Sequence, residues 1–145
     1  MKVILCAVDF SDEGKGVVEA AAAEARLRDA QLWLVHVAAP DPTFVGYEAG
    51  PDNERIFRAG TLRAEHQTLQ ERAEELKLQG VDATAILVQG PTCEMLIKEA
   101  CDLEADLIVI GSHRHGLWHR ALWGSTEDSV IEQAPCPVLV VPVAI

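Results

Sequence analysis

The sequence predicts an α/β fold: a doubly wound, five-stranded, mainly parallel sheet with helices on both faces, in a single domain over residues 1–145. Five short apolar runs alternate with helical patterns, as in strand–helix–strand units. The runs are mostly continuous rather than alternating with polar residues, which favours strands buried on both faces. The 145 residues, 49% of them hydrophobic, are enough to build one core.

The runs predicted to be strands are short and rich in Val, Ile, Leu and Ala. Each is followed by residues that favour turns or by a helical pattern, except the last, which closes the chain. They are Val3–Val8, Leu32–Val37, Ala83–Val88, Leu107–Ile110 and Val138–Val143.

Two helices are predicted between the first three runs. The first, Gly16–Arg28, is rich in alanine, and Ser11 or Asp12 is placed to cap its start. The second, Leu62–Leu78, consists largely of strong helix formers, and Gly80 can close it in a left-handed conformation.

Two more helices are predicted in the second half. Thr92 is placed to cap the third, in which three apolar residues fall on one face. The fourth, Ser125–Gln133, has acidic residues in its first turn and ends before Pro135. The apolar face of the third helix consists of Leu96, Ala100 and Leu103.

The segment Ala38–Asn53 is long for a connection in such a fold. Its three prolines and two glycines exclude a regular helix. Because it leaves the end of the second strand, it is either a lid over a site or a surface loop, and the sequence leaves both open.

The overall charge limits the classes of partner. A formal net charge of −11 and a pI of about 4.7 argue against nonspecific binding to nucleic acid or to an anionic membrane. No apolar run approaches the roughly 20 residues of a membrane span, so we expect a cytoplasmic protein. The four cysteines lack C-x-x-C spacing and are predicted to be small buried hydrophobes. They are Cys6, Cys93, Cys101 and Cys136.

The stretch from Gly111 to Thr126 has the composition of an anion site. It combines glycines, a hydroxyl pair at a predicted helix start and two arginines, and no Asp or Glu occurs between Leu107 and Thr126. Exposed backbone N–H groups and a helix N-terminus bind phosphate well. A P-loop is excluded, because Gly116 is followed by Leu117 rather than by lysine. A solvated loop is the alternative.

Three further patterns have both a functional and a structural interpretation. Asp9 ends the first strand, where its carboxylate can accept hydrogen bonds from a ribose or an adenine amino group, or can simply close a turn. Gly14-Lys15-Gly16 lacks the third glycine of a dinucleotide fingerprint, since Glu19 stands there. Three histidines have a metal-like spacing, but no acidic or cysteine ligand is near, so we predict no metal site. They are His113, His115 and His119.

Several motifs together resemble the universal stress protein family, whose nucleotide-binding branch carries G-x-x-G-x(9)-G-[ST]. Gly111, Gly124 and Ser125 fit this pattern, whereas Arg114 stands in place of the second glycine. The likeness covers nearly the whole chain. Its other segments are Val8-Asp9-Phe10-Ser11, Gly90-Pro91, Ile110-Gly111-Ser112-His113 and the run from Ala134 to Val141.

The resemblance implies strand order 3-2-1-4-5, with the winding reversed between the first and fourth strands, where ligands bind in such sheets. It implies a regulatory homodimer that binds ATP or AMP in a stress response, with Mg²⁺ able to accompany the phosphates. No catalytic residues are predicted; slow ATP hydrolysis or autophosphorylation is the most that is expected. The predicted nucleotide-binding residues are Val8, Asp9, Ser11, Val37, Ile110, Gly111, His113, Arg114, Gly116, Gly124, Ser125 and Thr126.

Two alternatives stay open. Arg114 either pairs with phosphate or strains the loop, in which case the protein is a stress-protein dimer that has lost the nucleotide and acts through protein contacts. An enzyme of unrecognised chemistry is the third class. The expected dimer contact is the strand Val138–Val143, an apolar edge in which Pro142 is tolerated only where its missing N–H faces no neighbour.

Overall fold

The computed structural model describes residues 2–9, 14–38, 52–112 and 125–142, with side chains throughout except at 14–15, 52–61 and 125–128. They form one five-stranded, all-parallel sheet of order β3-β2-β1-β4-β5, which confirms the predicted fold class and strand order. The elements are β1 (Val3–Ala7), α1 (Gly14–Arg28), β2 (Gln31–Ala38), α2 (Asp52–Leu78), β3 (Ala83–Gln89), α3 (Thr92–Asp102), β4 (Leu107–Ser112), α5 (Ser125–Gln133) and β5 (Val138–Pro142).

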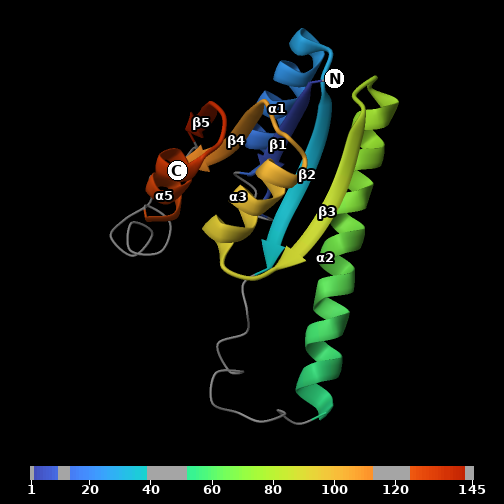
Figure 1. The fold of residues 1–145 in the computed structure, drawn as a ribbon. Helices are drawn as coiled ribbons and strands as arrows, with labels where there is room; N and C mark the ends of the chain where they lie inside the picture. The colour runs from blue at the N-terminus through green and yellow to red at the C-terminus, as the bar shows by residue number, and fades with distance from the viewer. Residues whose placement is uncertain (1, 10–13, 39–51, 113–124, 143–145) are drawn as a thin grey trace.

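Helices cover both faces of the sheet (Figure 1). α1 and α2 pack on one face and α3 and α5 on the other, and each pair encloses its own hydrophobic cluster. Side chains of a strand alternate between faces. In β1, Ile4 and Cys6 therefore face α1 and α2, whereas Val3 and Leu5 face α3 and α5. Burial on both faces explains why the runs are apolar throughout.

β1 occupies the centre of the sheet, between β2 and β4. Cys6 pairs with Leu34 of β2 on one side and with Val109 of β4 on the other. The chain winds from β1 through β2 to β3, and then returns across the sheet to β4 and β5. The winding therefore reverses between β1 and β4, as expected.

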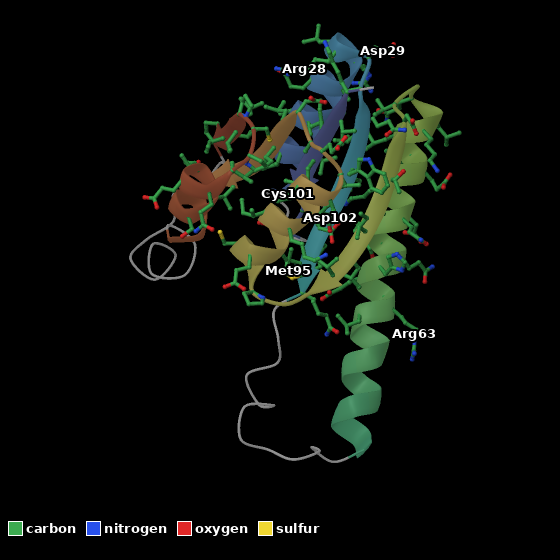
Figure 2. The ribbon with its side chains drawn as sticks, in the orientation of Figure 1. Arg28, Asp29, Arg63, Met95, Cys101 and Asp102 are labelled. Carbon is green, nitrogen blue, oxygen red and sulfur yellow. The ribbon has the colours of Figure 1, made fainter. Side chains whose placement is uncertain are left out.

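α2 is longer than the sequence patterns predict. It begins at Asp52 rather than at Leu62, and its 27 residues span about 40 Å. Its first half extends beyond the carboxyl ends of the strands (Figure 1), and the Arg63 side chain points away from the sheet (Figure 2). The prediction of a non-helical Ala38–Asn53 is thus wrong at Asp52 and Asn53, because no proline follows Pro51. Residues 39–51 lie outside the described part.

Three helices end in the same way. One or two residues after the end of each helix, a residue adopts a positive φ. The residue after it is buried and donates its N–H to the carbonyl five positions earlier in the chain. Gly80 has φ +88°, as predicted, and Asp29 and Glu104 have φ +51° and +53°. The donors are Ala30, Val81 and Ala105, with N–H···O distances of 3.0, 2.9 and 2.9 Å.

Two local predictions are wrong. Thr92 does not cap α3: the cap is Pro91, which has an extended backbone and makes no side-chain cap, and its carbonyl accepts the first helical bond from Met95. The cysteines do not all lie in the core, since Cys101 is exposed. The expected apolar face of α3 is confirmed, with two residues buried and one packed against the same cluster: Leu96, Ala100 and Leu103.

Candidate functional site

The carboxyl ends of β1 and β4 lie side by side at the point where the winding reverses. The observed pairing of these strands runs up to Cys6 and Val109. Asp9 lies three residues beyond Cys6, and Ser112 lies three residues beyond Val109. Clefts at such a reversal are the usual ligand sites of open α/β sheets, because the adjoining loops diverge there.

At Val8 the side chain is buried, and both polar groups of the backbone are hydrogen-bonded to β2. The side chain is only 6% exposed and packs in the α1/α2 cluster. Its N–H donates to the carbonyl of Val35 at 2.8 Å, and its carbonyl accepts a hydrogen bond from Nδ1 of His36 at 2.7 Å. β2 therefore holds the main chain of Val8 on both of its polar groups.

The other described site residues on the strands are partly or fully packed. Ile110 is 5% exposed in the α3/α5 cluster, and Val37 packs against that cluster while remaining half-buried. Gly111 is half-buried and pairs with Val141. Its lack of a side chain leaves the main chain accessible to a close ligand, whereas Ile110 acts as a core residue.

Asp9 is half-buried, and its negative charge acts on the buried Cys6 thiol in the sheet. Burial, followed by the negative charge of Asp9, raises the pKa of the Cys6 thiol to about 12, while the Arg72 guanidinium opposes the shift. Asp9 and Arg72 therefore both act on the same buried thiol, and the Nη1 atom of Arg72 is itself buried. α2 thus carries a cation whose charge acts on the buried thiol of β1.

Three residues that act near the end of β1 are not among those predicted from the sequence: His36 and Glu65, which contact each other beside Val8, and Arg72, whose charge acts on Cys6. His36 is the polar residue in the otherwise apolar run Leu32–Val37, and nothing else in the local sequence marks it. Its Nε2 lies 3.3 Å from Oε2 of Glu65. On α2, Glu65 and Arg72 are spaced like the buried residues of the helix, which is a signal that a polar residue there faces the sheet.

The rest of the predicted cradle is not described. Ser125 and Thr126 begin α5, and only their backbone is described. The remaining predicted residues, with the metal-spaced histidines, lie outside the described ranges. They are Ser11, His113, Arg114, Gly116 and Gly124, together with His115 and His119.

Surface grooves occur elsewhere on the molecule. One of about 620 Å³ lies between α2 and residues Ala83–Ala85 at the start of β3. Another of about 370 Å³ lies between α1 and α2, lined by Arg26 and Arg72 among others. Neither groove is lined by Asp9, Gly111 or Ser112. Among the described residues, no group of three His, Cys, Asp or Glu is arranged to hold a metal ion.

Comparisons with known proteins agree on one family. The chain matches the model of the Universal stress protein family over residues 1–142. It is 36% identical to a curated universal stress protein of Thermus aquaticus, covering 97% of this chain and 98% of that one. The fold is similar to that of a universal stress protein from Lactobacillus plantarum, with a TM-score of 0.75, 23% identity and 97% coverage of each chain.

A further similar structure contains a nucleotide. It is the universal stress protein from Archaeoglobus fulgidus in complex with dAMP, which is 26% identical, with a TM-score of 0.67 and coverage of 97% of this chain and 98% of that one.

Proposed function

Because this chain belongs to the universal stress protein family, we propose that it binds an adenine nucleotide at the carboxyl ends of β1 and β4 and acts as a regulatory homodimer. The observation that carries the proposal is the adjacency of β1 and β4 in a sheet of order β3-β2-β1-β4-β5. It brings β1, which Asp9 closely follows, beside β4, which contains Gly111.

The two strand ends differ in chemistry, and this suits the two parts of a nucleotide. Asp9 offers a carboxylate, which accepts hydrogen bonds from ribose hydroxyls or from the adenine amino group. The chain after β4 carries the glycines and Arg114, and α5 begins at Ser125. A helix N-terminus presents free N–H groups and a partial positive charge to phosphate. The dAMP complex of the Archaeoglobus fulgidus relative supports adenine as the base.

Calorimetric titration with ATP, AMP and GTP tests the proposal. We expect binding of ATP or AMP, and a loss of at least about tenfold in affinity for Asp9→Asn, since a charged hydrogen bond contributes about 1.5–3 kcal/mol. Asp82→Asn is the matched control, because Asp82 is exposed and lies just before β3, at the amino ends of the strands rather than at their carboxyl ends. An absence of binding heat at millimolar ATP and AMP would overturn the proposal.

Arg114 gives the competing candidate its support, because it replaces a glycine of the family pattern. In that case the protein is a stress-protein dimer that acts through protein contacts without a nucleotide. The variant Arg114→Gly decides between the two: ATP binding gained only in the variant favours the competing candidate, and equal binding by both proteins favours a supporting role for Arg114.

The proposal extends to the setting of the protein. We infer one domain over residues 1–145, a cytoplasmic location and a homodimer that associates through β5. Among the helices that the structure describes, none is long and apolar enough to cross a membrane.

A further inference from the structure

The side chain of His36 contacts the carbonyl of Val8, in the peptide that links Val8 to Asp9. The Val8 carbonyl can only accept a hydrogen bond, so Nδ1 of His36 carries the proton and donates it over 2.7 Å. A peptide group is planar, and the carbonyl of Val8 shares its plane with the N–H and Cα of Asp9. Fixing that carbonyl therefore also fixes the direction in which the chain leaves the sheet at Asp9.

The imidazole is in turn held from α2. Its Nε2 lies 3.3 Å from Oε2 of Glu65, and the His36 side chain is only 15% exposed. A carboxylate oxygen, like the Val8 carbonyl, accepts hydrogen bonds, so each contact is made by a ring nitrogen that carries a proton, and the two contacts together fix the orientation of the ring. The contacts thus run from α2 through Glu65 and His36 of β2 to the end of β1.

We propose that His36, oriented by Glu65, is a positioning residue that sets the Val8–Asp9 peptide and thereby aims Asp9 at the nucleoside. This inference rests on the proposed function for its ligand. Neither side chain is assigned a contact with the nucleotide; both act through the main chain at Asp9. Nucleotide affinity then depends on a helix on the α1/α2 face, in addition to the residues that follow β4 in the chain.

Two substitutions at His36 test separately the contacts made by its two ring nitrogens. The amide nitrogen of asparagine occupies nearly the place of Nδ1, so His36→Asn keeps the donor to Val8 and loses the reach to Glu65. The amide nitrogen of glutamine reaches nearly to Nε2, so His36→Gln keeps the contact with Glu65 and loses the donor to Val8. We expect His36→Gln to weaken ATP or AMP binding about tenfold, and His36→Asn, which loses only the contact with Glu65, to weaken it by no more than about threefold.

The matched control is His66→Gln, on the same helix as Glu65, which should bind as the wild type does. Glu65→Ala should weaken binding about threefold, since the ring loses its orientation but keeps its donor. Thermal unfolding of each variant verifies that it folds. Equal affinity of His36→Gln and wild type, or equal losses in His36→Gln and His36→Asn, would overturn the proposal.

A second measurement needs no nucleotide. The ¹³C shift of the Val8 carbonyl and the ¹⁵N shift of the Asp9 amide report the hydrogen bond and the shared peptide plane. Both should move in His36→Gln and remain near the wild-type values in His36→Asn. Unmoved shifts in His36→Gln overturn the positioning role. Moved shifts in a protein that binds no nucleotide support the positioning of Asp9 and refute only the proposed function.

Discussion

Gly90 shows how a single residue shapes the edge that carries the site. Its φ is +145°, a backbone conformation that side chains rarely permit. Its N–H donates to the carbonyl of Ala38 at 3.2 Å, which ties the end of β2 to the turn between β3 and α3. A Cβ at Gly90 would lie 2.9 Å from Cγ of Met95, which lies beside that turn (Figure 2).

Gly90→Ala is therefore expected to destabilise the fold by about 1–3 kcal/mol, because the backbone is strained and Met95 must move. Urea unfolding measures the change. Gly16→Ala is the matched control: Gly16 lies in α1, where an added Cβ would meet nothing within 4 Å, and alanine favours a helix. That variant should be as stable as wild type or slightly more. Equal stabilities of the two variants would contradict the role given to Gly90.

At the scale of elements, α2 owes its place to a narrow buried face. Leu69 is fully buried, and Ala73 and Leu76 pack beside it in the α1/α2 cluster. Leu78, at the end of the same helix, is 90% exposed. The same face carries Glu65 and Arg72. The packing of Leu69 therefore also places the Glu65 carboxylate beside His36 and the Arg72 guanidinium where its charge acts on the Cys6 thiol.

Leu69→Ala is expected to cost about 2–5 kcal/mol in unfolding free energy, through lost burial and a cavity between α2 and the sheet. Leu78→Ala, the same chemical change on the same helix, should remain within about 0.5 kcal/mol of wild type. Chemical denaturation compares the two. A cost below about 1 kcal/mol for Leu69→Ala would show that α2 is not held by this contact.

Elements are predictable where the signal is local. Gly80 is expected to close α2 because a left-handed residue there favours glycine, and the structure confirms it. Asp29 and Glu104 end their helices in the same conformation without glycine, so composition alone does not indicate them. The start of α2 at Asp52 is not predictable in this way, because the prolines just before it favour a non-helical segment that would include Asp52.

At the scale of the whole molecule, the strand order follows from family resemblance, because spacing along the chain does not encode which strands pair. Asp9 and Gly111 can be selected from the sequence, since each ends an apolar run. His36, Glu65 and Arg72 cannot be combined in the same way. They come from β2 and α2, and both the contact of Glu65 with His36 and the influence of Arg72 on Cys6 depend on the packing of the helix on the sheet.

The proposed dimer rests on the open edge of the sheet. In the described part of the chain β5 has one neighbouring strand, β4, and its four apolar residues are only half-buried. The carbonyl of Pro137 accepts from the N–H of Ile108, so it faces β4. Backbone polar groups alternate along a strand. Val138, Val140 and Pro142 therefore direct theirs outward, and the missing N–H of Pro142 faces the open edge, as predicted.

This alternation separates dimer formation from folding. Val140→Pro removes an N–H that points outward, and should abolish pairing with a second β5 while leaving the β4 ladder intact. Leu139→Pro removes an N–H that points to β4, and should destabilise the fold by about 3 kcal/mol or more. Sedimentation velocity over a concentration series should show a dimer for wild type and a folded monomer for Val140→Pro. If Val140→Pro remained a dimer, the subunits would associate through another surface, and the half-buried apolar face of β5 would need a different cover.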